Sequence, residues 1–578
     1  MASRLVIDKN VLAPMRDGVA LATDIYRPYT EERLPTLVQR TPYNKDLAGV
    51  TDFVRMANAG YAVVVQDVRG RFASAGQFEP FIHEAEDGAD ALAWAASQPW
   101  STGAVGTIGA SYVGATQWLA ATTSPPALKA MAPFITAADY HDGWTYQGGA
   151  FELGFNLNWA LGFALTTIER GAAPGLAAAE SRELLIDAVD ALHDLYKRAP
   201  LVDVASILRA APYYVTWLDH PDDDAYWRRI APNAHYERIT APALNIGGWY
   251  DIFLGGTLAN YRGMKARGGS ALARTGQRLL IGPWSHGVFG SIYAERGYGF
   301  RAGSEAVDLT GVQLRWFDHI LKGIDDGLAS ERPVRLFIMG ANVWRDEDDW
   351  PLPDTIYRPY YLHSDGHANS LHGDGALTPA QPAAEPDDVY LYDPRDPTPT
   401  LGGPTLLPGA SVGANMGPRD QRPVETRHDV LCYTTPPQAR PLEVTGPVEL
   451  VLYVSSSARD TDFTGKLVDV APDGRAEILT EGILRARYRD SLSHPAPLEP
   501  GRIYELHLDL WATANVFATG HRVRLEVSSS NFPRFDRNTN TGGTIAREGL
   551  DDFVQAVNRV YHDSTHPSHV LLPIIERA

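Results

Sequence analysis

The sequence predicts an α/β domain that is interrupted by a helical insertion and followed by an all-β domain. Strand-like and helix-like stretches alternate in residues 1–140 and again in 241–350, as in a parallel sheet covered by helices. A helical period occupies 141–240, and beyond residue 350 the period becomes two. We therefore expect the first and third segments to share one sheet, 141–240 to form a helical cap, and 351–578 to form a jelly roll.

The predicted sheet consists of short apolar runs separated by turns and helices. In the first segment, a helix is expected at 85–97, after the apolar run at 61–66. In the third segment, each apolar run precedes a glycine-containing turn. The runs lie at 19–26, 36–39, 61–66, 243–246 and 279–281.

Two helices are expected in the cap. One is indicated by apolar residues at steps of four, three and four, which fall on one helix face: Leu185, Val189, Leu192 and Tyr196. The other spans 151–168, is apolar on most sides and carries Trp159. This second helix is interpreted as a lid over a pocket, with simple core packing as the alternative.

The all-β domain is predicted from period-two segments at 448–454, 506–510 and 521–527, separated by frequent Gly and Pro. In the last segment three apolar residues alternate with charged ones: Val523, Leu525 and Val527. We assign this domain only to packing against the α/β domain or to self-association.

Composition and charge limit the classes of function. The chain has 578 residues, of which 44% are hydrophobic and 21% are charged, as in a folded globular protein with more than one domain. Seventy acidic residues against fifty-one basic ones give a formal net charge of −19. Such a charge disfavours nucleic acids and anionic membranes as partners.

Cysteine usage and hydropathy further limit the classes of protein that the chain can belong to. The single cysteine, Cys432, excludes an intrachain disulfide and a thiolate metal cluster, and it is expected to be an inert strand residue. No segment approaches the ~20 apolar residues of a membrane span, and the first residues show no signal-peptide run. We therefore expect a cytoplasmic protein, and a homodimer is an open alternative to a monomer.

A short apolar strand, a tight turn and a helix surround Ser111, which lies between Gly109 and Gly114. This is the pattern of a nucleophile elbow, where small neighbours leave room for a sharp turn and for a carbonyl substrate. The second glycine comes one residue later than in Gly-x-Ser-x-Gly. A literal Gly-x-Ser-x-Gly surrounds Ser411, but it lies among Gly and Pro with no strand before it and no helix after it. We interpret Ser411 as a loop residue and Ser111 as the nucleophile.

A serine nucleophile needs a general base, and the base needs a carboxylate that orients it. In an α/β-hydrolase, the acid and then the histidine follow the serine on loops at the carboxyl ends of later strands. Asp251 and His286 follow the two later apolar runs in that order. Taken singly, Asp251 fits a helix N-cap and His286 a surface residue, but placement and order together favour catalysis. His83 and His141 match neither the strand-end rule nor the order.

An acyl-transfer site also needs hydrogen-bond donors for the carbonyl oxygen as it becomes negative. The elbow supplies the backbone N–H of Tyr112. The second donor is expected after an early strand, where the chain reads Arg-Thr-Pro-Tyr-Asn-Lys at 40–45. The Tyr43 hydroxyl fits that role, and spacing alone leaves a packing role equally open.

Six motifs lie along the chain: Arg-Thr-Pro-Tyr-Asn-Lys at 40–45, Gln-Asp-Val-Arg-Gly-Arg-Phe-Ala-Ser at 66–74, Gly-Ala-Ser-Tyr-Val-Gly at 109–114, Gly-Trp-Tyr-Asp at 248–251, Gly-Pro-Trp-Ser-His at 282–286 and the segment 527–538. Together they resemble the cocaine esterase branch of the X-prolyl dipeptidyl peptidase superfamily, in its CocE/NonD type. The resemblance covers essentially the whole chain and implies a serine hydrolase with an α/β-hydrolase domain split by a helical domain and followed by a jelly roll. It implies Ser111, Asp251 and His286 as the triad and Tyr43 as the oxyanion tyrosine. Such a serine mechanism needs no metal or organic cofactor.

The resemblance leaves the substrate open, since relatives cleave aryl esters, X-proline peptides or α-amino-acid esters. The last two classes must hold a protonated amine, and amino-acid ester hydrolases place carboxylates just after the catalytic aspartate. Here the residues after Asp251 are apolar: Ile252, Phe253 and Leu254. An ammonium site is therefore not expected. X-prolyl dipeptidyl peptidase and α-amino-acid ester hydrolase activity stay as alternatives.

Aromatic residues are expected to line the substrate pocket beside the triad: Trp144, Trp159, Trp249 and Phe253. Each fully buried aromatic group would contribute about 1.5 to 3 kcal/mol. We therefore expect the substrate to be a small, neutral, hydrophobic ester such as a benzoate, cleaved through an acyl-enzyme. An alternative from another class is a sugar-binding protein with an inactive hydrolase domain.

Overall fold

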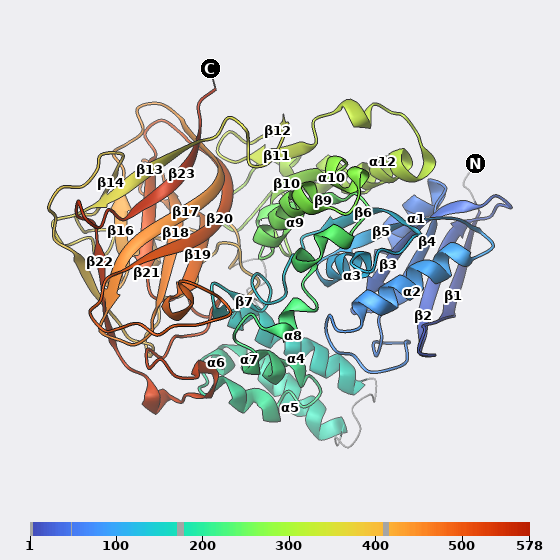
Figure 1. Cartoon of the computed structure of the whole chain (residues 1–578), viewed down its shortest axis with the longest axis horizontal. Coiled ribbons are helices and arrows are strands. Elements are labelled where there is room, and N and C mark those ends of the chain that lie inside the picture. Colours follow the sequence, from blue (N-terminus) through green and yellow to red (C-terminus); the bar gives the residue numbers. More distant parts are fainter. Residues whose placement is uncertain (1–3, 48, 170–177, 408–414, 578) are drawn as a thin grey trace.

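Two large β-sheets organise the chain in the computed structural model, which describes residues 4–47, 49–169, 178–407 and 415–577 (Figure 1). The first sheet belongs to an α/β domain, and the second, mostly antiparallel sheet forms the C-terminal domain. A group of helices lies below and between them in the view of Figure 1. The predicted fold class, an α/β domain followed by an all-β domain, is confirmed, whereas the residue boundaries of the domains stay predictions.

Within the described residues, the first sheet has ten strands in the order β1-β2-β4-β3-β5-β6-β9-β10-β11-β12. Its centre, from β4 to β11, is parallel, and antiparallel strands border it on both sides. The strands are β1 (Leu5–Pro14), β2 (Ala20–Pro28), β3 (Leu34–Thr41), β4 (Ala62–Asp67), β5 (Ser101–Ala110), β6 (Leu128–Phe134), β9 (Leu244–Tyr250), β10 (Arg278–Ser285), β11 (Val334–Ile338) and β12 (Val343–Glu347).

Helices cover both faces of this sheet, which explains why a central strand such as β4 is buried along its whole length. On one face Phe53 and Phe317, from α1 and α12, join the core. On the other face the core includes Leu92, Trp118 and Met264 from α2, α3 and α9. The helices are α1 (Val50–Asn58), α2 (Glu84–Ser97), α3 (Tyr112–Ala121), α9 (Leu254–Arg267), α10 (Ala271–Thr275), α11 (Ser304–Val307) and α12 (Leu309–Lys322).

The cap lies between β6 and β9. Leu185, Leu192 and Tyr196 are buried as predicted, but Val189 is 40% exposed. The predicted stripe is wrong at Val189, because in the last turn of the first helix the buried position is taken by Ala188. The four residues also belong to two helices, since the first ends at Asp190 and the second begins at Leu192. The cap elements are β7 (Tyr146–Gln147), β8 (Ala150–Phe151), α4 (Leu153–Glu169), α5 (Ala178–Asp190), α6 (Leu192–Tyr196), α7 (Tyr213–Asp219) and α8 (Ala225–Arg228).

In the C-terminal domain, Val523, Leu525 and Val527 are fully buried, as the period-two pattern predicts. Glu526 is buried as well, beside Lys466 of the neighbouring strand. Cys432 is a free, buried thiol on a strand. The elements are β13 (Ile356–His363), β14 (Ala376–Thr378), β15 (Asp388–Tyr392), α13 (Arg422–Glu425), β16 (Leu431–Thr434), β17 (Leu442–Ser456), β18 (Asp462–Val470), β19 (Ala476–Arg485), β20 (Tyr504–Phe517), β21 (Arg522–Ser528), β22 (Ala556–Tyr561) and β23 (His569–Ile575).

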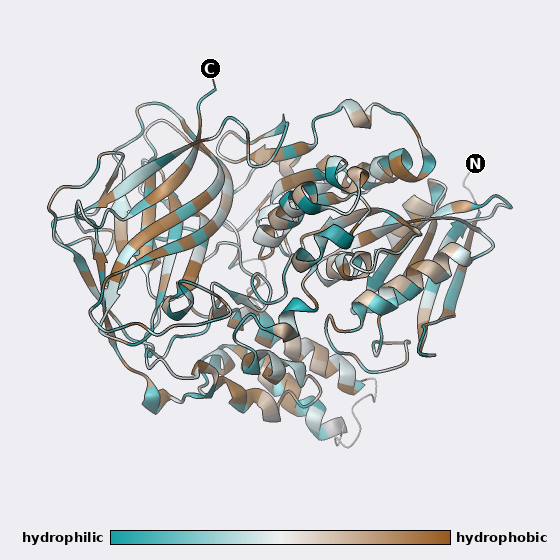
Figure 2. Ribbon diagram, viewed as in Figure 1, coloured by the Kyte–Doolittle hydropathy of each residue, from teal (hydrophilic) through white to brown (hydrophobic). Residues whose placement is uncertain are grey.

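The two domains share one hydrophobic core, which runs from β9 and β11 into the strands of the C-terminal sheet. Met339, just after β11, exchanges backbone hydrogen bonds with Ala514 and Val516 of β20. Figure 2 shows hydrophobic residues along the strands of both sheets and on the cap helices. Of the helices in the described parts of the chain, none is long and apolar enough to cross a membrane.

Candidate active site

Ser111 lies at the junction between β5, which ends at Ala110, and α3, which begins at Tyr112. Its φ of 60° and ψ of −126° place it in a backbone region that non-glycine residues rarely adopt, as a nucleophile elbow requires. A Cβ on Gly109 would lie 2.1 Å from Val113, and one on Gly114 would lie 2.8 Å from Thr136 beyond β6. The glycine that comes one residue late therefore lets α3 approach the segment that follows β6.

Ser111, His286 and Asp251 form a continuous hydrogen-bonded relay. His286 Nε2 lies 2.8 Å from Ser111 Oγ, and His286 Nδ1 lies 2.6 Å from Asp251 Oδ1. The buried Asp251 also accepts a hydrogen bond from the Phe253 backbone N–H through Oδ2, at 3.1 Å. With its proton on Nδ1, the imidazole can accept the serine proton at Nε2. The structure thus brings together the three residues that the strand-end rule selected.

The segments before Asp251 and His286 differ from the prediction. Gly247 and Gly248 belong to β9, which runs to Tyr250, and β10 runs to Ser285, so both predicted turns are strand. A Cβ on Gly248 would lie 2.3 Å from the backbone oxygen of Trp284 in β10. These glycines therefore serve the close approach of two strands, and the acid and the base follow directly at the strand ends.

Two hydrogen-bond donors converge beside Ser111. One is the backbone N–H of Tyr112, the first residue of α3. The other is the Tyr43 hydroxyl, which lies near enough to Ser111 to interact with it and accepts a hydrogen bond from Trp159 Nε1 at 3.2 Å. Although 39% of the surface of Tyr43 is exposed, desolvation at the site raises the pKa of its hydroxyl, which therefore stays protonated and able to donate.

The side chain of Tyr112 is held by a buried polar network that the sequence analysis missed. Its hydroxyl donates to Glu84 Oε1 at 3.0 Å and accepts from the Phe81 backbone N–H at 2.8 Å. Glu84 in turn pairs with Arg40 at 2.7 Å, and burial raises the pKa of this carboxyl. No local pattern marks Glu84, because its partners lie far away in the sequence.

Three of the four predicted pocket residues are buried near the relay, and one of them, Phe253, contacts it directly. The Phe253 ring stands edge-on to His286, with centroids 4.9 Å apart, and stacks on Trp144 at 4.2 Å. Trp159 stacks on the Tyr112 ring at 6.0 Å and donates to Tyr43. These aromatic side chains come from the cap and from the segment after Asp251.

The prediction for Trp249 is wrong. Its indole N–H donates to the backbone oxygen of Phe337 in β11 at 2.7 Å, and its ring packs on Trp350 in the core shared by the two domains. The reason is that Trp249 lies within β9, where it faces the layer packed on the sheet, whereas the triad lies beyond the strand ends.

Further aromatic residues around Trp159 were missed. Phe163 stacks on Trp159 at 3.9 Å, and Phe78 stacks on Phe163 at 5.3 Å. Tyr213 meets Trp159 edge-on at 5.8 Å. Phe163 follows Trp159 by four residues in α4, so helical spacing was a usable signal, whereas Phe78 lies outside any regular pattern.

The other candidate residues lie elsewhere or outside the description. His83 precedes α2, and His141 is fully buried with Nε2 2.9 Å from the backbone oxygen of Pro221. Ser411 lies outside the described residues. No group of three or more His, Cys, Asp or Glu side chains among the described residues has the arrangement of a metal site.

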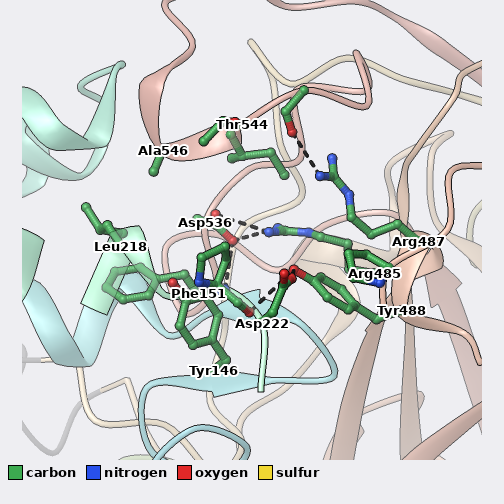
Figure 3. A pocket seen from close by; sticks show the side chains of 14 residues that line it. Tyr146, Phe151, Leu218, Asp222, Arg485, Arg487, Tyr488, Asp536, Thr544 and Ala546 are labelled. Atoms are coloured by element: carbon green, nitrogen blue, oxygen red, sulfur yellow. Dashed lines mark hydrogen bonds and ion pairs between the residues drawn. The ribbon is translucent and has the colours of Figure 1, made fainter. Parts of the chain in front are cut away.

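A separate cavity of about 190 Å³ lies between the cap and the C-terminal domain (Figure 3). Beside it, Arg485 pairs with Asp462 at 2.9 Å and with Asp536 at 2.7 Å, and Asp536 accepts a hydrogen bond from the backbone of Phe151 in the cap. None of the triad residues lines this cavity, so it belongs to the contact between the domains.

An elbow serine, a histidine and a buried aspartate on the strand ends of a mostly parallel sheet define an α/β-hydrolase of the serine type. Residues 17–288 match the model of the X-Pro dipeptidyl-peptidase (S15) family, and residues 326–571 match that of the X-Pro dipeptidyl-peptidase C-terminal non-catalytic domain. Over 99% of both chains, the sequence is 44% identical to a cocaine esterase from Rhodococcus sp. (strain MB1 Bresler). The chain belongs to the S15 family and is a serine hydrolase that acts on ester bonds.

Solved structures agree with this assignment. An aminopeptidase from a marine sediment archaeon, Thaumarchaeota archaeon, is 26% identical with a TM-score of 0.83, covering 99% of this chain and 96% of its own. An α-amino acid ester hydrolase is 27% identical with a TM-score of 0.83, covering 99% and 97%. The fold is thus shared by proteins that are named for different reactions, and the substrate must be argued from the site itself.

Proposed function

We propose that the protein is a carboxylesterase that hydrolyses neutral, hydrophobic esters with an aromatic acyl group, with Ser111 as nucleophile, His286 as general base and Asp251 as the residue that orients it. The observation that carries this proposal is the unbroken relay from Asp251 through His286 to Ser111, beside a wall of aromatic rings.

In the first half of the reaction, Ser111 Oγ attacks the ester carbonyl carbon while its proton passes to His286 Nε2. The oxyanion accepts hydrogen bonds from the Tyr112 backbone N–H and the Tyr43 hydroxyl. When the tetrahedral intermediate collapses, the bond to the alcohol oxygen breaks and His286 gives its proton to that oxygen. Water then repeats these steps on the acyl-enzyme, which releases the carboxylic acid and restores Ser111.

Three observations support a substrate with an aromatic group, and the second of them also favours an uncharged one. Phe253, Trp144 and Trp159 place ring faces and edges beside the triad. The residues after Asp251 are apolar and buried, so they offer no carboxylate to an ammonium group. The relative that is 44% identical is named a cocaine esterase.

A site for α-amino-acid esters or X-proline peptides would need an anionic partner for the amine. Instead, the positive charge of the buried Arg71 acts on Tyr43, at the oxyanion side of the site. That charge disfavours an ammonium group nearby. Equal concentrations of phenyl benzoate, a phenylglycine ester and an X-Pro anilide separate the three activities, and we expect the benzoate to give the highest kcat/KM.

The roles of the triad are tested by Ser111→Ala. We expect it to abolish turnover of 4-nitrophenyl benzoate and labelling by a fluorophosphonate, which reacts only with an activated serine. Wild-type protein that is folded but neither labelled nor active would favour the sugar-binding alternative. A cytoplasmic location and homodimer formation stay predictions, which cell fractionation and sedimentation would test.

A further inference from the structure

The segment 66–74, Gln-Asp-Val-Arg-Gly-Arg-Phe-Ala-Ser, follows β4 and supplies none of the residues of the proposed mechanism. We propose that Arg71 in this segment is a positioning residue, which clamps the loop that carries Tyr43 against the cap helix α4 and so fixes the Tyr43 hydroxyl as an oxyanion donor. This inference rests on the proposed function and assigns a role to a residue that does not touch the substrate.

Arg71 connects the two segments directly. Its side chain is almost fully buried, at 1% exposure. Nε donates to the backbone oxygen of Pro42 at 3.0 Å, while Nη1 and Nη2 donate to Thr167 Oγ1 at 3.1 Å and Thr166 Oγ1 at 2.6 Å. One rigid, planar group thus joins the residue next to Tyr43 to the last turn of α4.

The same helix holds the other end of Tyr43. Trp159, two turns earlier in α4, donates its indole N–H to the Tyr43 hydroxyl at 3.2 Å. The Tyr43 ring also meets Phe163 of α4 edge-on, with centroids 5.6 Å apart. Because Arg71 holds the backbone before Tyr43 and Trp159 holds its hydroxyl, a shift of the loop relative to α4 would displace the donor.

The rest of the segment anchors the loop on its other side. Asp67 Oδ1 accepts a hydrogen bond from the Lys45 backbone N–H at 2.8 Å, and the Val68 N–H donates to the Thr41 backbone oxygen at 3.0 Å. The loop 41–45 is therefore bonded to 66–74 before and after Tyr43, with Arg71 bound between these two anchors.

Stacking and charge make arginine specific for this place. Its guanidinium carbon lies 4.4 Å from the centroid of the Phe163 ring and 5.3 Å from that of Phe78. A lysine ammonium can neither stack in this way nor bond in three directions with a planar fork. Desolvation raises the pKa of the Tyr43 hydroxyl, and the positive charge of Arg71 opposes that rise. By opposing it, the charge makes the hydroxyl a stronger hydrogen-bond donor.

A double-mutant cycle tests the inference with Arg71→Gln and Arg71→Lys, each combined with Tyr43→Phe. With Tyr43 present, we expect either change to lower kcat for 4-nitrophenyl benzoate at least about tenfold and to change KM less than about twofold, because the oxyanion forms only in the transition state. In the Tyr43→Phe background, we expect the same changes to cost less than about twofold, since the donor that Arg71 positions is already gone.

Arg69→Lys is the matched control. Arg69 lies in the same segment but pairs with Asp87 at 2.6 Å and Asp17 at 2.8 Å instead of the loop. We expect Arg69→Lys to leave kcat within about twofold of wild type. Should Arg71→Gln fail to fold, as circular dichroism would show, Arg71→Lys and the pair Thr166→Val and Thr167→Val carry the same test.

Equal losses in the wild-type and Tyr43→Phe backgrounds would overturn the inference, as would wild-type kcat in folded Arg71 variants or in Tyr43→Phe. These results differ from a failure of the proposed function, in which the wild-type protein itself neither turns over the ester nor reacts with a fluorophosphonate. If the wild-type enzyme is active but the effects of the Arg71 and Tyr43→Phe changes simply add, only the positioning role of Arg71 is refuted.

Discussion

Replacing Tyr43 by Phe removes one hydroxyl from the candidate oxyanion hole and keeps the ring. The ring contact with Phe163, with centroids 5.6 Å apart, is preserved. The perturbation is therefore confined to the hydrogen bond with Trp159 and the interaction of the hydroxyl with Ser111. The Tyr112 backbone N–H would be left as the remaining donor.

The loss of one oxyanion donor lowers kcat by about 10² to 10³, which corresponds to about 2.7 to 4 kcal/mol. The indole N–H of Trp159 also loses its acceptor, and an unsatisfied buried donor costs about 1 to 3 kcal/mol of folding stability. We therefore expect a large fall in kcat, a small change in KM and a modest decrease in Tm. Initial rates with 4-nitrophenyl benzoate and a thermal melt measure all three.

Tyr213→Phe provides the matched control. Tyr213 is buried in the same aromatic group and meets Trp159 edge-on at 5.8 Å, but among the described residues its hydroxyl has no hydrogen-bond partner. We expect Tyr213→Phe to keep kcat within about threefold of wild type. A kcat of Tyr43→Phe above one third of the wild-type value, or an equal loss in Tyr213→Phe, would refute the assignment of Tyr43 as a donor.

Three further predictions concern the acid, the elbow and the C-terminal domain. Asp251→Asn is expected to lower kcat about 10⁴-fold with little change in the fold, because an amide in contact with His286 Nδ1 favours the wrong tautomer; steady-state rates and circular dichroism decide. Gly114→Ala is expected to cost about 1 to 3 kcal/mol of stability, because the added methyl group would lie too close to Thr136, which follows β6. Gly162→Ala, at an open position in α4, is expected to stabilise by about 0.5 to 1 kcal/mol, and denaturant melts compare the two variants. The buried His562 contacts Asp388 and Glu385, and although burial opposes the shift, these carboxylates raise the pKa of His562 above 6.5. Its contribution to stability is therefore complete below pH 6.5 and is lost as the pH rises through the raised pKa. His562→Gln should flatten this part of a profile of Tm against pH, and an unchanged profile contradicts the assignment.

The triad could be predicted from the sequence because its information is local. Each member follows a short apolar run, and in a parallel sheet the carboxyl ends of such runs meet at one edge. That rule needs neither side-chain contacts nor exact strand lengths, so it held even though the predicted turns before Asp251 and His286 proved to be strand.

The aromatic residues near the triad and the supporting network depend on contacts between residues that lie far apart in the sequence. Trp249 was misplaced because the sequence does not show whether Gly247 and Gly248 bend the chain or let two strands approach, and only the second places the indole in the domain core. Glu84 and Arg71 act through partners that are 28 to 96 residues away, so no local period identifies them. Phe163 was within reach of helical spacing.

In the proposed mechanism, one helix couples selectivity and catalysis. Trp159 and Phe163 of α4 form part of the aromatic wall, and the same helix bonds to Tyr43 through Trp159 and to the Tyr43 loop through Arg71. On this proposal, a substitution in α4 that makes room for a larger acyl group also moves an oxyanion donor. Changing the acyl group that the enzyme accepts should thus lower kcat for all esters, unless the change leaves both contacts to the Tyr43 loop intact. Phe253 has no such contact to that loop in the described part of the chain, and it is the position where the pocket can be altered with the least effect on the donor.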